Sequence, residues 1–167
     1  METNQPTPAD VPPERYAEID RLEPLVGRWS IETVLPEGQE PSGQEPAAWT
    51  TFEWLSGRFF LVQRWAVDLP EAPDGIAVIG IEPTSIGGPF TGPLFTQRYF
   101  DSRGVHRVYA MTLDDGLWRL WRDSPGFAQR FRGEFSADGD SIEGAWDKSA
   151  DGVTWQRDLT LRYRRVG

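Results

Sequence analysis

The chain of 167 residues contains no cysteine, one histidine and one lysine. Without cysteine there is no disulfide framework, no thiolate metal site and no cysteine nucleophile. Long hydrophobic runs are also missing: no segment approaches the roughly 18 apolar residues of a membrane helix. Residues 1–13 have neither the basic start nor the apolar core of a signal peptide. We therefore expect a cytoplasmic protein without membrane attachment.

Acidic residues are in excess: 26 Asp and Glu against 17 Lys and Arg give a formal net charge of −9, and Lys148 is the only lysine. Nucleic-acid binding depends on clustered Lys and Arg that neutralise phosphates, so no nucleic-acid partner is expected. The one histidine, His106, cannot assemble a metal site alone and is expected at the surface or rim of the fold. Most acidic clusters fall in predicted turns, where carboxylates shape loops. The sequence thus predicts no metal site.

Aromatic residues are abundant: eight Trp, nine Phe and four Tyr make up 13% of the chain. From about Phe95 to Tyr163 they recur on one face of short alternating segments separated by Gly- and Asp-containing turns. This pattern predicts an all-β, antiparallel barrel with an aromatic interior. The length suits one domain, so we expect a flexible, proline-rich leader over 1–13 and a single barrel domain over 14–167.

A short amphipathic helix is expected over Glu14–Val26, limited by Pro24, where it would plug one mouth of the barrel. About ten strands follow. They are predicted over Trp29–Leu35, Trp49–Leu55, Arg58–Leu69, Ile76–Glu82, Phe95–Phe100, Val105–Leu113, Leu117–Asp123, Gln129–Ser136, Ser141–Asp147 and Thr154–Tyr163. Two longer loops, 36–48 and 83–93, are interpreted either as lids or as plain insertions.

The alternation of side chains along each strand assigns them to two faces. Gln129 and Phe131 fall on the face opposite Arg130 and Arg132, and Trp155, Arg157, Leu159, Leu161 and Tyr163 fall on one common face. By the same rule Gln63 and Arg122 point inward. A buried arginine is costly without a partner, so Arg122 and Arg157 each need a carboxylate, carbonyl groups, water or a ligand.

Three segments carry a resemblance to a known superfamily. Gly27–Arg28–Trp29, directly after the helix, resembles the Gly-x-Trp element of the calycins, which include lipocalins, fatty-acid-binding proteins and nitrobindins. Residues 57–65 resemble the opening hairpin of nitrobindin-like proteins, and 151–164 resemble the closing strand of bacterial lipocalin-like domains. The resemblance implies a ten-stranded barrel with a short N-terminal helix and an internal site for a small, mostly apolar molecule.

The same resemblance bears on cofactors. Nitrobindins bind haem through a histidine on the closing strand, whereas residues 156–159 of this chain read Gln-Arg-Asp-Leu. Haem binding is kept only as a minor alternative, and no cofactor is expected. Arg107 and Tyr109, on one face, resemble the Arg-x-Tyr pair with which fatty-acid-binding proteins hold a carboxylate. The competing interpretation is an internal ion pair between Arg107 and an acidic side chain.

The main hypothesis is a protein that binds a small apolar or aromatic molecule, including one with a carboxylate or carbonyl group, in the barrel. The alternative is a cofactor-independent cyclase or isomerase that uses the same cavity. A homodimer is left open. The predicted ligand-binding residues are the inward polar and aromatic side chains Gln63, Trp65, Tyr99, Arg107, Tyr109, Met111, Trp118, Arg122, Gln129, Phe131, Trp146 and Arg157.

Overall fold

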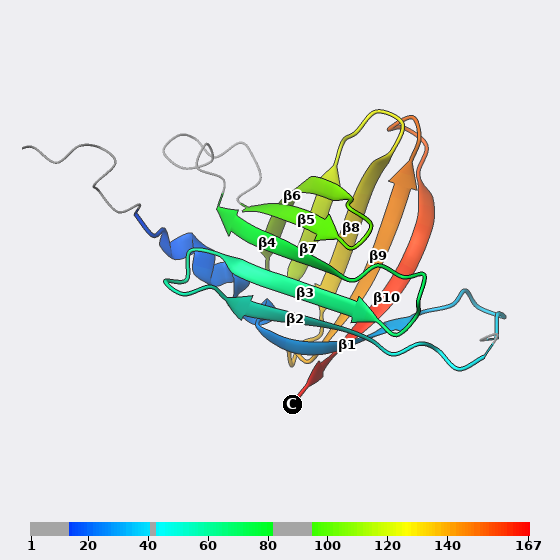
Figure 1. Ribbon diagram of the computed structural model, residues 1–167, viewed down its shortest axis with the longest axis horizontal. Helices are drawn as coiled ribbons and strands as arrows, with labels where there is room; N and C mark the ends of the chain where they lie inside the picture. Colours follow the sequence, from blue (N-terminus) through cyan, green and yellow to red (C-terminus); the bar gives the residue numbers. More distant parts are fainter. Residues whose placement is uncertain (1–13, 41–42, 82–94) are drawn as a thin grey trace, which may run out of the picture.

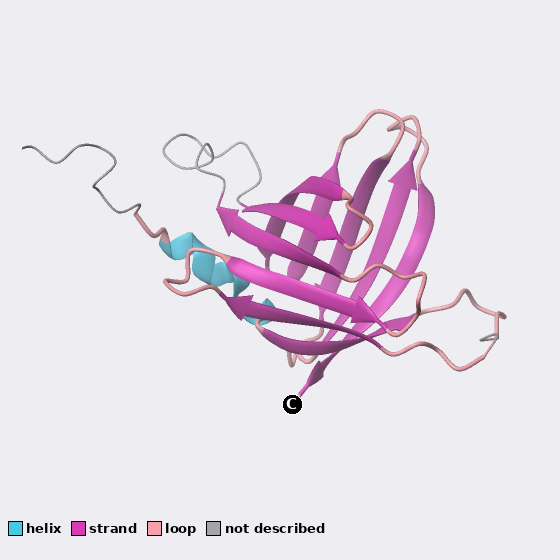
Figure 2. Ribbon diagram, viewed as in Figure 1, coloured by secondary structure: helices cyan, strands magenta, loops and turns pink. Residues whose placement is uncertain are grey.

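A computed structural model describes residues 14–40, 43–81 and 95–167 (Figure 1). It confirms the predicted all-β class: ten antiparallel strands form a closed barrel, preceded by one short helix (Figure 2). The elements are the 3-10 helix η2 (Ala17–Leu25) and the strands β1 (Gly27–Thr33), β2 (Ala48–Trp54), β3 (Leu61–Val67), β4 (Gly75–Ile81), β5 (Phe95–Asp101), β6 (His106–Asp114), β7 (Leu117–Arg122), β8 (Ala128–Phe135), β9 (Ser141–Ser149) and β10 (Gln156–Val166).

Each strand pairs with its neighbours in sequence, and β1 also pairs with β10, from Arg28 opposite Val166 to Thr33 opposite Leu161. This last pairing closes the barrel, so each of the ten described strands has a partner on both edges. The tightest connection is the predicted turn between β6 and β7, where Asp115 (φ 50°) and Gly116 (φ 73°) both adopt positive φ. Two such residues favour the right-handed twist of a hairpin, which is why an Asp-Gly pair occurs there.

The observed strands match the predicted ones with shifts of a few residues at their ends. The N-terminal helix begins at Ala17 rather than Glu14, has 3-10 geometry and includes Pro24 in its last turn. The expected leader over 1–13 and the loop over 83–93 lie outside the described residues, as do positions 41–42 of the other long loop.

Helix η2 covers one end of the barrel, as predicted, whereas the segment between β1 and β2 extends from the other end (Figure 1). The apolar face of η2 carries Ile19, Leu22 and Leu25, which are completely or almost completely buried. Trp29 is fully buried beneath the helix and donates its Nε1–H to the carbonyl oxygen of Leu25 over 2.8 Å. Arg165 of β10 places its guanidinium carbon 4.2 Å from the centroid of the Trp29 ring. This packing makes the helix end the closed end.

The apolar core lies next to this closed end. Phe52, Leu61, Phe95 and Met111 come from four different strands and are at most 1% exposed. Burial of such side chains stabilises the barrel by about 1.5–3 kcal/mol each. Polar interior side chains such as Gln63, Gln97 and Gln129 lie outside this apolar core and are 5–8% exposed.

Candidate ligand-binding cavity

The barrel contains a cavity of about 930 Å³ that opens at the end opposite η2. This volume is in the range of small-molecule sites, which are concave, mostly apolar and contain a few polar groups. Residues 39–40 and 43–46, between β1 and β2, contribute to its mouth. The inner lining comes from the strands and includes Gln63, Trp65, Gln97, Tyr99, Arg107, Tyr109, Trp118, Leu120, Gln129, Phe131, Trp146, Leu161 and Tyr163.

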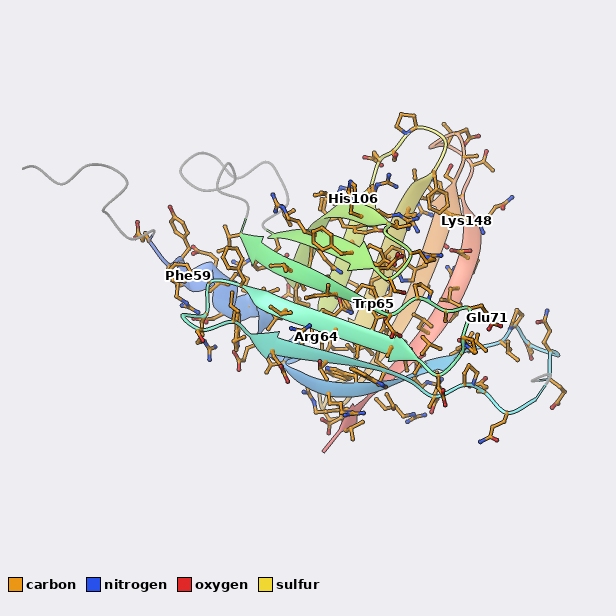
Figure 3. All side chains as sticks on the ribbon, in the orientation of Figure 1. Phe59, Arg64, Trp65, Glu71, His106 and Lys148 are labelled. Atoms are coloured by element: carbon orange, nitrogen blue, oxygen red, sulfur yellow. The ribbon has the colours of Figure 1, made fainter. Side chains whose placement is uncertain are left out.

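Aromatic rings form a continuous wall from the mouth of this cavity to its floor. At the mouth, Trp65 stacks on Tyr99 with 4.9 Å between ring centroids. Trp65 lies on β3, toward the open end of the barrel (Figure 3). Tyr109 and Trp146 continue the wall with an edge contact of 5.6 Å. Deeper contacts follow, from Trp146 to Phe131 at 5.2 Å and from Phe131 to Trp118 at 4.8 Å.

Glycines give Phe131 its place in the interior. Gly133 and Gly144 lie opposite each other on β8 and β9. A Cβ atom on Gly144 would lie 2.7 Å from the Phe131 ring, and one on Gly133 would lie 2.9 Å from it. Such distances are too short for any side chain, so the two glycines make the space that this ring occupies.

A buried carboxylate organises one side of the mouth. The side chain of Asp101 is 0% exposed and accepts hydrogen bonds from the Tyr99 hydroxyl (2.8 Å) and from Nη2 of Arg103 (2.6 Å). Its other oxygen accepts the backbone N–H groups of Arg103 and Val105. These bonds, the one from the Arg103 side chain first, hold the pKa of Asp101 well below its usual range. Burial, followed by the bond to Asp101, raises the pKa of Tyr99 to about 12.

Arg107 enters the cavity without a carboxylate partner among the described residues. Its Nη1 donates to Oε1 of Gln129 over 3.0 Å, and the Tyr109 hydroxyl donates to the same oxygen over 2.8 Å. The guanidinium also lies over the rings of Tyr99 and Phe127, at 5.8 and 5.2 Å. The internal ion pair considered for Arg107 is therefore not found within residues 14–40, 43–81 and 95–167.

A second hydrogen-bonded chain runs across the strands β2, β3 and β5. Thr50 is fully buried and donates its hydroxyl to the carbonyl oxygen of Arg64 over 2.9 Å. Gln63 donates its amide to the Thr50 hydroxyl oxygen over 3.2 Å, and Gln97 donates to Oε1 of Gln63 over 3.1 Å. Gln63 and Gln97 sit on β3 and β5, and they meet across β4, where Gln63 is paired with Ala77 and Gln97 with Ile79.

Two buried polar atoms of the lining have no hydrogen-bond partner among the described residues: Oε1 of Gln97 and Nε1 of Trp118. Gln97 is 5% exposed and Trp118 is 2% exposed. Leaving a buried polar atom unpaired costs about 1–3 kcal/mol, and both atoms belong to residues that line the cavity, so a ligand or water that moves in beside either atom would remove this cost. Among the described residues, the lining thus has one unpaired acceptor, Gln97 Oε1, and one unpaired donor, Trp118 Nε1.

Most predicted site residues meet in this cavity: Gln63, Trp65, Tyr99, Arg107, Tyr109, Trp118, Gln129, Phe131 and Trp146 line it. Met111 faces inward but lies in the closed core, 0% exposed. Arg122 bends to the loop that follows its strand, where it donates to the carbonyl oxygen of Phe127 (3.2 Å) and the hydroxyl of Ser124 (3.0 Å). Neither Met111 nor Arg122 contributes to the cavity wall.

The inward assignment of Arg157 is wrong. Its side chain is 57% exposed and binds Asp147 over 2.7 Å, and Asp147 also binds Arg130 on the outer face. The cause is a bulge in β10: Arg157 pairs with Asp147 but Leu159 pairs with Trp146, so the register shifts between them. A bulge inserts one residue and reverses the alternation. Trp155, before the bulge, accordingly packs under Arg130 on the outside.

Three residues that carry the hydrogen bonds described above were not predicted: Thr50, Asp101 and Arg103. Gln97 was a candidate hydrogen-bonding residue of the interior, but the sequence left its face ambiguous. Alternation with Tyr99 would have placed Gln97 and Asp101 inside, but large residues occupy both faces of β5 and hide the pattern. In the structure Phe100 is 46% exposed, on the outer face.

His106 lies at the start of β6 and is exposed, on the opposite face from Arg107 (Figure 3). It therefore does not reach the cavity. Among the residues that the structure describes, no three His, Asp or Glu side chains gather in a group suited to a metal ion. Nor is any helix in this part of the chain long and apolar enough to span a membrane.

The fold and the cavity define the class of protein: a closed, ten-stranded antiparallel β-barrel with an internal chamber. This architecture is consistent with the calycin resemblance. The sequence matches no protein-family model and no curated protein. Membership of the calycin superfamily thus stays a prediction.

Proposed function

We propose that the protein binds a small molecule with an aromatic or apolar body and a few hydrogen-bonding groups, inside the barrel cavity. The observation that carries this proposal is the pair of unpartnered buried atoms, Oε1 of Gln97 and Nε1 of Trp118, in the lining of a cavity of about 930 Å³. An interior evolved only for packing would be filled to about the density of organic crystals and would pair these atoms.

The rest of the lining supports the same function. Stacked and edge-on rings such as Trp65, Tyr99 and Phe131 provide large, rigid contact surfaces for a planar ligand. The Arg107 guanidinium is held in place by Gln129 and two rings, so a carbonyl or carboxylate group on a ligand would meet a preorganised donor. A cyclase or isomerase activity in this cavity stays a prediction from the sequence.

The test uses N-phenyl-1-naphthylamine, a neutral dye whose fluorescence rises in apolar surroundings. We expect saturable binding of one dye per chain to the full-length protein. Ala48 lines the mouth, so Ala48→Trp would narrow it, whereas Val108 is 55% exposed on the outer face of β6. Ala48→Trp should weaken dye binding at least about tenfold, and Val108→Trp should leave it unchanged. The proposal fails if dye binding is not saturable or if both variants behave alike.

A further inference from the structure

The polarity of the Thr50–Gln63–Gln97 chain is fixed at its backbone end. The carbonyl oxygen of Arg64 can only accept, and it lies 2.9 Å from the Thr50 hydroxyl oxygen. Two oxygens at that distance need a proton between them, and only Thr50 carries one. The Thr50 hydroxyl therefore donates its single proton to the carbonyl oxygen of Arg64, so its own oxygen can only accept a hydrogen bond from Gln63.

This direction passes from one side chain to the next. Because the Thr50 oxygen accepts, Gln63 must present its NH₂ group to it, and its own Oε1 then faces Gln97. Gln97 in turn must present NH₂ to Gln63, which leaves its Oε1 as the free end. Both glutamines are at most 8% exposed, so water outside the barrel does not compete with the chain. Hydrogen bonds aligned in one direction also polarise one another, which strengthens the last acceptor.

We propose that Gln97 determines the specificity of the cavity: its Oε1, at the end of this one-way chain, accepts a hydrogen bond from a neutral hydroxyl or N–H group of an aromatic or apolar ligand. The inference rests on the proposed function and names the class of ligand. A ligand that offers only an ether or carboxylate oxygen to Gln97 would leave two acceptors facing each other. An aromatic alcohol removes the unpaired acceptor, because its hydroxyl group donates a hydrogen bond to that oxygen.

Two neutral probes of nearly equal shape test the assignment. 2-Naphthol has the hydroxyl donor, and 2-methoxynaphthalene has the same ring system without it. Their dissociation constants are measured by displacement of the naphthylamine dye. We expect the wild-type protein to bind 2-naphthol about tenfold more tightly than the ether, a difference of about 1.4 kcal/mol.

Three variants then test whether Gln97, rather than the rest of the cavity, causes the preference for 2-naphthol over the ether. Gln97→Met keeps the length of the side chain and should bring the ratio of the two dissociation constants close to one. Arg98→Met, on the exposed face of the same strand, should leave the ratio at its wild-type value. Thr50→Val removes the group that orients the chain, so both glutamine amides can turn over. We expect this variant to lower the ratio although Gln97 itself is unchanged.

The ratio is independent of the overall affinity of each variant, so a moderate loss of stability does not disturb it. An unchanged ratio in both Gln97→Met and Thr50→Val would overturn the inference while the proposed function stands. Tighter binding of 2-naphthoate than of 2-naphthol by the wild type would also overturn it, because the polar group would then be held by Arg107. If none of the naphthalene probes displaces the dye, the inference fails, and saturable dye binding alone decides the proposed function.

Discussion

Arg165 is expected to hold the closed end of the barrel together, and its neighbour Arg164 provides a matched control. Arg165 donates from Nη1 to the carbonyl oxygen of Val26 (2.7 Å) and from Nη2 to those of Pro24 (2.9 Å) and Gly139 (3.2 Å). Its Nε also lies 3.3 Å from Oδ1 of Asp140, which is exposed. Its guanidinium also covers Trp29. Arg164 is 54% exposed, and among the described residues its side chain has one ion-pair partner, Glu32 at 3.5 Å. The two side chains therefore share a strand and a charge but differ in their contacts.

The size of the effect follows from these contacts. The two shorter hydrogen bonds, to Val26 and Pro24, contribute about 1.5 kcal/mol each at the low end, and the contact with the ring adds about 1 kcal/mol. The longer bond to Gly139 and the exposed ion pair with Asp140 are left out of the sum, because such contacts add little. The side-chain entropy regained on truncation offsets about 1–2 kcal/mol. Arg165→Ala should thus lower the free energy of unfolding by about 2–3 kcal/mol. For a chain of this length that corresponds to a Tm about 4–12 °C lower.

The assay is urea unfolding followed by tryptophan fluorescence, together with thermal unfolding. Arg164→Ala should change the stability by no more than about 0.5 kcal/mol, as exposed ion pairs do. Arg165→Lys keeps the charge but lacks the planar fork, so it should recover less than half of the loss. Equal stabilities of Arg164→Ala and Arg165→Ala would refute the idea that Arg165 ties the helix to the barrel.

Three further predictions concern the cavity wall. In Gly75→Ala the new Cβ would lie 1.9 Å from the Trp65 ring, so Trp65 must leave its stack on Tyr99; near-UV circular dichroism should change and dye binding should weaken. In Gly144→Ala the Cβ would meet Phe131 at 2.7 Å, and urea unfolding should show a loss of about 1–3 kcal/mol. The pKa of Tyr99, raised to about 12, lies above the unfolded value near 10, so its contribution to stability is complete below pH 10 and disappears as the pH rises toward 12. Unfolding midpoints measured across that range should fall more steeply for the wild type than for Tyr99→Phe, and parallel curves would contradict this.

The fold could be predicted from the sequence because its signals are local. Alternation marked the strands, and turns such as Asp115–Gly116 marked the hairpins between them. Neither depends on which residues meet across the barrel. The error at Arg157 shows the limit of this reasoning: a bulge is decided by the register of β10 against β9, and no residue type in 155–159 announces it.

The site was predictable only in part, for a related reason. Inward faces identified rings such as Trp118 and Phe131, since period two is enough for that. The hydrogen bond between Gln63 and Gln97 joins two strands that are not neighbours, because it crosses β4 between them. Thr50 adds a direction that comes from a backbone carbonyl group. Contacts of this kind arise from tertiary structure, which a single sequence does not display.

The sequence predicts three inward arginines, Arg107, Arg122 and Arg157, and the structure places each in a different environment. Arg157 is outside and neutralised by Asp147, and Arg122 donates to the loop after its strand. Arg107 alone among these three lines the cavity, where the neutral Gln129 is its hydrogen-bond partner. A guanidinium held by a neutral amide and aromatic faces keeps its positive charge uncompensated by the described residues. The cavity therefore contains a positive group, Arg107, and an unpaired hydrogen-bond acceptor, Gln97 Oε1. This arrangement suits a polar ligand bound in one orientation better than a hydrocarbon without polar groups.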